Sequence, residues 1–366
     1  MTRAYKSPLH GGLSSSRAAP SGTGLTTAPA AGTGRISRRS VLIGTVIGLP
    51  VSALFLWLAV RGLDPSKVWS ALADAEPGRV AAAVLAMLAV YLVQAERWRV
   101  IARSSMPPLP YRSYLAMLVG GVAVNNVVPG RPGEILRGYW LSRAARAPFG
   151  RAFSTVVLDR AADVLALLLF LVASFPFVRH PSWLENLLVA VLVLAAVVVV
   201  AIGAAWWYSH RSARGRARAE AGAVHRSRIR AQASAFVRGI AAAVNPRDAV
   251  PITLLSLAAW GLWASGAWLV ASALGVTLSP LEVGLVTAVI NLGTAIPSSP
   301  GFIGTYQYLA VSTLGLFGVN RDTAFAFSVL LQASWFIPVT LAGLGVALWW
   351  WAGRGRDLRE MGSSTA

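Results

Sequence analysis

Long apolar stretches are the feature that most limits how this chain can fold. The stretches 41–60, 185–208 and 323–351 each hold 20 or more residues with no more than one charged side chain. A helix needs about 20 such residues to cross the roughly 30 Å of hydrocarbon in a bilayer. Because 55% of the 366 residues are apolar and only 13% are charged, the sequence predicts an all-α polytopic membrane protein.

The apolar segments, taken in chain order, predict about six full transmembrane spans and two interrupted segments. We expect the spans near 41–60, 80–101, 152–178, 185–208, 249–274 and 323–351. Composition then divides the chain into a disordered basic cytoplasmic tail (1–40), a first membrane half (41–208), a basic cytoplasmic loop with nine arginines (209–248), a second membrane half (249–352) and a cytoplasmic tail (353–366).

A motif of the form Pro-x-x-Pro-Gly interrupts each of the two remaining apolar segments. Prolines remove backbone donors and break helices, and glycine permits a tight turn. Each motif predicts a re-entrant helical hairpin, at 112–145 and at 281–318, with simple helix termination as the alternative. The expected hinge residues are Asn125, Pro129, Gly130, Pro132 and Gly133 in the first hairpin and Pro297, Pro300, Gly301, Gly304 and Tyr306 in the second.

The distribution of basic residues predicts the orientation of the chain. With six spans and two hairpins, the cytoplasmic segments hold 27 of the 33 lysines and arginines, whereas the outer loops hold five. The positive-inside rule therefore puts both termini in the cytoplasm. The richness of the chain in alanine, glycine and arginine is typical of a GC-rich bacterial genome, so we expect a bacterial cytoplasmic membrane. The hairpins then enter from opposite sides, as in the inverted-topology repeats of many transporters. If each hairpin crossed the membrane completely, the chain would have ten full spans, and the basic segments and both termini would still lie on the same sides. Ten full spans are therefore the alternative.

Six ionisable residues lie within or beside apolar sequence, and we take them as the candidate substrate-binding residues. Asp159 and Asp163 follow Arg151 by about 12 and 18 Å along a helix, which is well inside the hydrocarbon region. Each unpaired charge there costs roughly 2.5–3.5 kcal/mol, so these groups must pair or line a cavity. The six candidates are Arg131, Glu134, Arg137, Asp159, Arg160 and Asp163.

The spacing of these charges leaves two interpretations open. Asp159 and Asp163 are spaced i,i+4 and share a helix face, while Glu134 and Arg137 are spaced i,i+3. The set can thus form an ion-pair network that only holds the first hairpin to the next helix. Alternatively it forms a polar site, in which the arginines bind phosphate and the acids balance a cationic headgroup or exchange protons.

Several kinds of chemistry are not expected from this sequence. The chain has no cysteine, and its four histidines are scattered without ligand spacing, so we expect no metal site and no cofactor. It contains no Gly-x-x-x-x-Gly-Lys-Ser/Thr motif for ATP. The net charge of +19 comes mainly from arginines that flank the predicted membrane spans. We therefore expect membrane lipids as partners and no nucleic acid.

Four sequence segments resemble a known family. They are Glu96-Arg97-Trp98-Arg99, the run from Asn125 to Arg137, Leu158-Asp159-Arg160-Ala-Ala-Asp163, and the run from Pro297 to Tyr306. Together they are similar to the lysylphosphatidylglycerol synthase transmembrane region, a flippase-like membrane domain also found in multiple peptide resistance factors. The similarity covers roughly residues 41–352. The family often has an acid where this chain has Gln307, a difference that argues against a proton or cation role for the second hairpin.

The resemblance implies translocation of a polar-headed lipid, either a phospholipid or a polyprenyl-phosphate-linked lipid, rather than chemical catalysis. Only 15 residues follow Trp351, so we expect no aminoacyl-transferase activity from this chain. One alternative is a membrane-embedded enzyme acting on a lipid-linked substrate, with Asp159 or Glu134 as general base. Another is a non-catalytic scaffold that docks lipid- or glycan-synthesis enzymes on the arginine-rich segment 209–248. The sequence does not indicate an oligomeric state.

Overall fold

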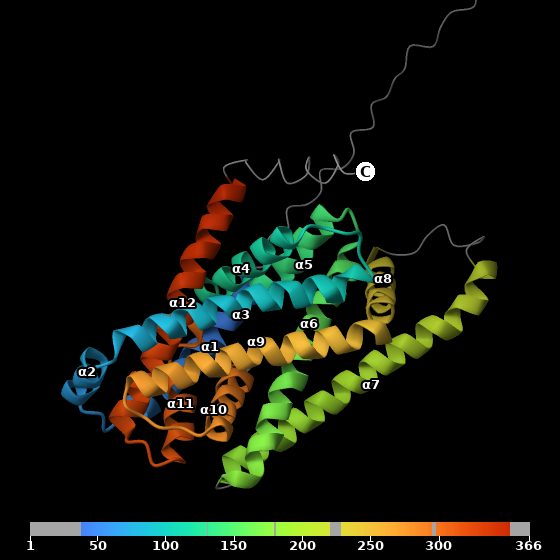
Figure 1. Cartoon of the computed structure of the whole chain (residues 1–366). Helices are drawn as coiled ribbons and strands as arrows, with labels where there is room; N and C mark the ends of the chain where they lie inside the picture. Colours follow the sequence, from blue (N-terminus) through green and yellow to red (C-terminus); the bar gives the residue numbers. More distant parts are fainter. Residues whose placement is uncertain (1–37, 130, 179–180, 220–227, 295–297, 352–366) are drawn as a thin grey trace, which may run out of the picture. The chain divides into compact units, whose positions relative to one another are not determined.

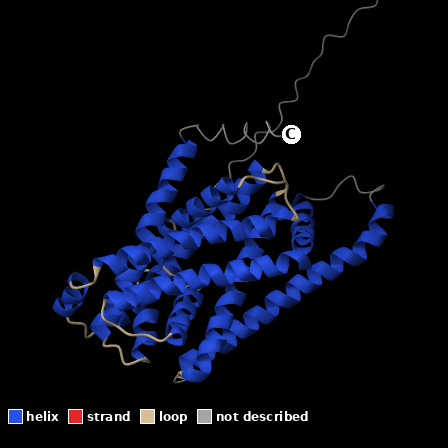
Figure 2. Cartoon of the chain, viewed as in Figure 1, coloured by secondary structure: helices blue, strands red, loops and turns tan. Residues whose placement is uncertain are grey.

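The computed structural model describes residues 38–129, 131–178, 181–219, 228–294 and 298–351. All regular structure in these residues is helical (Figure 2), which confirms the predicted all-α class. The described residues belong to one compact unit, 37–366. The hinge residues Gly130 and Pro297 and most of both predicted tails lie outside the described residues.

Twelve α-helices and two short 3-10 helices form within the described residues (Figure 1). The first part of the chain holds α1 (Arg38–Val60), α2 (Pro65–Ala73), α3 (Pro77–Arg103), α4 (Tyr111–Val127), α5 (Pro132–Ala144), α6 (Phe149–Ser174), η1 (Phe175–Phe177) and α7 (Ser182–Ala219). The second part holds α8 (Arg228–Ala243), α9 (Pro246–Ala273), α10 (Pro280–Gly293), η2 (Pro300–Phe302), α11 (Thr305–Gly315) and α12 (Arg321–Trp351).

Four of the described helices are long and apolar enough to cross a membrane. They are α3, residues 182–207 of α7, α9, and residues 321–346 of α12. Helix α6 has 26 residues, so it is also long enough to span. It differs from the four because Asp159, Arg160 and Asp163 interrupt its apolar sequence.

The two Pro-x-x-Pro-Gly motifs lie between pairs of short helices, α4 with α5 and α10 with α11. These helices have 17, 13, 14 and 11 residues, so each is about 17–26 Å long and shorter than the hydrocarbon layer. Pro132 occupies the first turn of α5, and the Asn125 side chain accepts a hydrogen bond from the Gly133 nitrogen at 2.7 Å. A side chain at Gly133 would overlap the Gly121 carbonyl group, so glycine is what lets α4 and α5 pack this closely.

Helices α3 and α9 pack side by side along their lengths (Figure 1). At one end Arg103 of α3 forms an ion pair with the buried Asp248 of α9, and the Ser104 hydroxyl donates to the same carboxylate at 2.7 Å. Farther along, Gly266 of α9 leaves room for the side chain of Met87. These contacts hold α3 and α9 together and so fix the positions of the polar residues on both helices.

Helices α1 and α12 pack against the second hairpin. Phe55 of α1 stacks on Tyr308 of α11 with ring centroids 5.0 Å apart. From α12, Gln332 hydrogen-bonds with the side chain of Gln307. Gln307 also accepts a hydrogen bond from the Gly304 nitrogen at 2.7 Å. The residue that replaces the expected acid is thus used to cap α11 and to hold it to α12.

The segment 209–248, for which the sequence predicts a basic cytoplasmic loop with an amphipathic helix in part of it, is largely helical where it is described. Helix α7 continues to Ala219 and α8 covers Arg228–Ala243. Helix α8 packs on α6: the Gln232 side chain accepts from the Gly150 nitrogen at 2.9 Å, and Phe236 lies 6.3 Å from Phe153 between ring centroids. Since α6 covers this face of α8, the face is not free to lie on a membrane surface.

Candidate functional site

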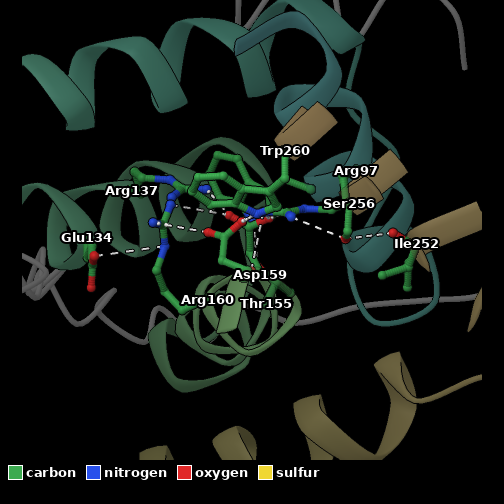
Figure 3. A network of polar contacts seen from close by, with 11 residues as sticks. Arg97, Glu134, Arg137, Thr155, Asp159, Arg160, Ile252, Ser256 and Trp260 are labelled. Atoms are coloured by element: carbon green, nitrogen blue, oxygen red, sulfur yellow. Dashed lines mark hydrogen bonds and ion pairs between the residues drawn. The ribbon is translucent and has the colours of Figure 1, made fainter. Parts of the chain in front are cut away.

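Arg97 of α3 forms the centre of a buried ion-pair network between α3, α5, α6 and α9 (Figure 3). Its side chain is 0% exposed. The Nε atom donates to Asp159 Oδ1 at 3.0 Å, and Nη2 lies 2.8 Å from Asp159 Oδ1 and 2.7 Å from Asp163 Oδ1. One guanidinium reaches both carboxylates because the two aspartates are one helical turn apart on the same face of α6.

Arg137 of α5 supplies a second cation to Asp159. Its Nη2 atom donates to Asp159 Oδ2 at 2.9 Å, and its side chain is only 1% exposed. The guanidinium also lies over the ring of Trp98, 4.3 Å from the ring centroid. A methyl group at Gly121 would come within 2.6 Å of Arg137 Cγ. The absence of a side chain at Gly121 therefore leaves room for the aliphatic part of Arg137. These contacts fix Arg137 in place, and its buried Nε atom has no hydrogen-bond partner among the described residues.

Neutral polar side chains complete the inner part of the network. Ser256 of α9 accepts a hydrogen bond from Arg97 Nη1 at 3.2 Å. Trp260 of the same helix donates from Nε1 to Asp163 Oδ1 at 3.1 Å. Helix α9 therefore closes the side of the network away from α5, as Figure 3 shows for Ser256 and Trp260.

Arg160 is the accessible member of the network. Its side chain is 40% exposed, and its Nη1 atom lies 3.2 Å from Asp163 Oδ2. Longer separations join Nη2 to Asp159 Oδ2, 3.7 Å, and Nε to Glu134 Oε1, 3.9 Å. Glu134 is itself 30% exposed. Figure 3 shows Arg160 and Glu134 on the side of the network away from Arg97, so the network is buried on one side and accessible on the other.

The network is neutral in formal charge. Three arginines (Arg97, Arg137, Arg160) face three acids (Glu134, Asp159, Asp163). Burial of so many charges is tolerable only because they are paired. Within the described residues, no group of three or more histidine, cysteine, aspartate or glutamate side chains is arranged to hold a metal ion.

Arg131 lies apart from this network, at the tip of the first hairpin. Its guanidinium donates to the Thr294 carbonyl oxygen at the end of α10 and lies over the ring of Phe302, 4.7 Å from the centroid. Arg131 (φ 53°) and Phe302 (φ 62°) are both in the left-handed region, which is unfavourable for residues other than glycine. The tips of the two hairpins therefore touch, and the contact includes strained backbone on both sides.

The structure brings together five of the six residues predicted for the site and places the sixth, Arg131, at the contact between hairpins. Several of the predicted hinge residues lie within the described part of the two hairpins. Pro132 and Gly133 begin α5, and Pro300 and Gly301 form η2. Gly304 has φ 93° just before α11. Tyr306 is buried in the first turn of that helix.

Sequence reasoning missed the central residue of the network. The predicted span 80–101 includes Arg97 near its end, but the charge count assigns Arg97 to the cytoplasmic segment 97–112, because charged residues and Trp98 surround it. The sequence did indicate that Arg97 lies inside the span, because Val100, Ile101 and Ala102 continue the apolar helix beyond it. Ser256 and Trp260 carried no such signal, because single serine and tryptophan residues are common in apolar helices.

Comparison with known proteins gives consistent matches. The family described as "Lysylphosphatidylglycerol synthase TM region" matches residues 41–343. The chain is 29% identical over 352 residues to Glycosyltransferase AglD of Haloferax volcanii, covering 86% of this chain and 55% of that protein. A UPF0104 membrane protein of Methanothermobacter thermautotrophicus is 26% identical over 323 residues, covering 82% of this chain and 93% of that protein. A UPF0104 membrane protein of Methanocaldococcus jannaschii is 26% identical over 162 residues, covering 43% and 48%. The chain thus spans about half the length of two of these relatives and most of the third.

Proposed function

Because the chain is an integral membrane protein that belongs to the family of the lysylphosphatidylglycerol synthase transmembrane region, we propose that it moves a polar-headed lipid between the leaflets of the bacterial cytoplasmic membrane. The lipid is a phospholipid or a polyprenyl-phosphate-linked lipid. The observation that supports this proposal is the position of Arg160, which together with Glu134 is accessible at one side of a neutral ion-pair network whose other members are buried.

The position of Arg160 supports a headgroup pathway. It lies about 16 Å along α6, near the middle of that 26-residue helix. A charge exposed to lipid at that depth costs roughly 2.5–3.5 kcal/mol. An arginine that is 40% exposed there is better explained if it lines a water-filled path than if it faces hydrocarbon. Its guanidinium has the planar fork of donors that suits a phosphate group.

The three arginines of the network then have different roles. Arg97 and Arg137 are buried and hold Asp159 in place, so they position α6 and support Arg160. Arg160 binds the lipid phosphate, because it is the most exposed and has the longest ion pairs. Glu134 lies close enough to Arg160 to act as its counter-ion when no lipid is bound.

The same proposal includes a topology of six full spans and two re-entrant hairpins in an inverted repeat, with both termini cytoplasmic. Helices α10 and α11 are about 21 and 17 Å long, which is too short to cross the hydrocarbon layer. The contact of Arg131 with Thr294 and Phe302 supports hairpins that meet within the membrane. Many transporters bind substrate at such broken helices between inverted repeats.

The test is a leaflet-accessibility assay in proteoliposomes with labelled anionic, aminoacylated and polyprenyl-phosphate lipids. We expect the native protein to move one lipid class and Arg160→Ala to slow that movement at least about tenfold, the effect of losing one charge-assisted contact. Arg143→Ala, which removes an exposed arginine from the end of α5, is the matched control. If folded native protein moves none of the three classes, the proposal is wrong.

A membrane-embedded enzyme acting on a lipid-linked substrate is the second candidate. It is favoured by one observation, the similarity to Glycosyltransferase AglD, of which this chain covers 55%. Glu134 is the accessible acid that could act as general base in such a reaction. Formation of a new lipid-linked product by the purified protein, without lipid movement, would favour this candidate.

A further inference from the structure

Arg131 differs from the arginines of the ion-pair network because it has no acidic partner. Each arginine of the network contacts at least one aspartate. Within the described part of the chain, Arg131 forms no ion pair. Its guanidinium is held by two uncharged groups, the Thr294 carbonyl oxygen and the ring of Phe302. A partly buried cation with only neutral partners is a group that an anion can stabilise strongly.

The charges of the network and of the first hairpin tip do not cancel. The network alone pairs three arginines with three acids, and Arg131 adds one positive charge. Glu134, which lies one turn farther along the same hairpin arm, faces Arg160 at 3.9 Å. The tip therefore keeps an excess of one positive charge, which a single anionic group would neutralise.

The backbone is strained on both sides of the contact. Arg131 has φ 53° and Phe302 has φ 62°. Gly301 (φ 69°) and Gly304 (φ 93°) lie on either side of Phe302, so three of the four residues 301–304 have positive φ. Residues other than glycine adopt this conformation at an energetic cost, and such residues are common in switch regions and ligand clamps. Loss of the contact would allow both residues to relax.

The contact joins the two hairpins directly. Helix α4 of the first hairpin also packs on η2 of the second. The hydrogen bonds of Asn126 and of the Gly301 carbonyl instead hold each hairpin to α12. Arg131 immediately precedes α5, the helix that carries Glu134 and Arg137. Movement of the tip would therefore also move the two residues of α5 that face α6.

We propose that Arg131 is a latch between the two hairpins that an anionic lipid headgroup releases. A phosphate oxygen takes the guanidinium from the Thr294 carbonyl and the Phe302 ring, because a charge-assisted hydrogen bond is about twice as strong as a bond between neutral groups. The hairpin tips then separate and open a path for the headgroup. This inference rests on the proposed function and adds to it how lipid binding moves the hairpins.

The test measures the separation of the hairpin tips in the full-length protein. Spin labels are attached to Val127→Cys and Ile303→Cys, two exposed positions at the end of α4 and directly after η2. The dipolar coupling between the labels is recorded in detergent without ligand, with polyprenyl phosphate, with uncharged polyprenol and with inorganic phosphate. Leu85→Cys with Trp268→Cys, on the packed helices α3 and α9, is the control pair.

We expect polyprenyl phosphate to reduce the short-distance population by at least about half. Polyprenol has no charge, and inorganic phosphate has no chain that concentrates it in the micelle, so both should leave the distance unchanged. The control pair should respond to none of the ligands. An unchanged distance with polyprenyl phosphate, or an equal response to polyprenol, would overturn the inference. An equal response to inorganic phosphate would overturn the assignment of the anion to a lipid.

Two variants in the labelled protein test Arg131 and its aromatic partner. Folded Arg131→Ala should show the longer distance without ligand and should not respond to polyprenyl phosphate. Phe302→Leu keeps the cation but removes the ring, so the tips should separate at a several-fold lower concentration of polyprenyl phosphate. Arg143→Ala, at the other end of α5, is the matched control and should respond as native protein does. A native response of Arg131→Ala and Phe302→Leu would overturn the inference.

The outcomes separate the inference from the proposed function. If polyprenyl phosphate separates the tips but native protein moves no lipid in proteoliposomes, the latch stands and translocation is wrong. If lipids move, but the tip distance does not change and Arg131→Ala moves lipid at the native rate, translocation stands and the latch is wrong.

Discussion

At the scale of single residues, Arg97 explains how two carboxylates are accommodated between α3, α5, α6 and α9. It contacts Asp159 and Asp163 at 2.7–2.8 Å and is fully buried. The desolvation cost of such a group is offset only while all partners are present. Arg160 differs, since it keeps 40% exposure and has a 3.9 Å contact with Glu134. The network thus combines a structural part with a part that a ligand can reach.

Removal of Arg97 should destabilise the protein strongly. In Arg97→Ala the two aspartates would lose their shared cation inside the protein, a loss of about 3–5 kcal/mol in the free energy of unfolding. Thermal unfolding of native protein and variant in detergent measures this loss of stability. Arg99→Ala is the control, because Arg99 is exposed and forms an ion pair with the nearby Glu96, and we expect a change below about 1 kcal/mol there. Equal stabilities of the two variants would contradict this account of the network.

Glu134 should compete with the lipid phosphate for Arg160. If it does, Glu134→Gln removes the competing charge and should strengthen the binding of an anionic lipid several-fold, or about 1 kcal/mol. Affinity for labelled polyprenyl phosphate in detergent measures this effect. Glu185→Gln, on the exposed first turn of α7, is the control and should bind as native protein does. Weaker binding by Glu134→Gln would show instead that Glu134 helps to hold the headgroup.

At the scale of elements, the first hairpin depends on close approach of its two helices. Gly133 is at the start of α5 and touches the backbone of Gly121 in α4. Asn125 and Pro132 then fix the turn, since one caps the new helix and the other begins it. This packing positions Glu134 and Arg137, which lie one and four residues farther along α5.

Gly133→Ala should separate α4 from α5. The added methyl group would overlap the Gly121 carbonyl and lie 2.7 Å from the Asn125 side-chain oxygen, a clash we expect to cost about 1–3 kcal/mol. Gly261→Ala, in the middle of α9 with nothing within 4 Å of the new group, is the control. It should be neutral or slightly stabilising, by up to about 1 kcal/mol. Thermal unfolding of both variants checks this, and a stable Gly133→Ala would contradict it.

At the scale of the whole molecule, α12 connects the two hairpins. Thr340 accepts a hydrogen bond from Asn126 in the first hairpin at 2.8 Å, and Gln332 donates to the Gly301 carbonyl oxygen in the second. With the contact of Arg131 on Phe302, these bonds tie both hairpin tips to one helix. A relative movement of the hairpins would have to break or shift this set of contacts.

The proposed topology predicts a pattern of labelling in intact cells. The chain has no cysteine, so single cysteines can be introduced one at a time. An impermeant thiol reagent added outside should label Lys67→Cys, in the outer helix α2, and should not label Arg146→Cys, between α5 and α6. Val127→Cys, at the exposed tip of the first hairpin, should stay unlabelled if the hairpin is re-entrant. Labelling of Val127→Cys from outside would favour ten full spans.

The sequence by itself determined the helical class, the family and most of the candidate site. These follow from local properties: apolar runs of helical length, breaks at Pro-x-x-Pro-Gly, and acids spaced one turn apart in α6. Five of the predicted residues meet in the structure because Glu134 and Arg137 share α5, Asp159, Arg160 and Asp163 share α6, and the two helices are neighbours in the chain.

Only the tertiary structure decided which charges are buried and which are accessible. Arg97 is 62 residues from Asp159 in sequence and 159 residues from Ser256, and no local pattern relates them. Its pairing exists because α3 and α9 pack along α6, which also leaves Arg160 on the open side. The same long-range packing brings Trp335 of α12 against Tyr306 of α11. Charge pairing inside a protein depends on distances through space, and sequence spacing gives these only within one helix.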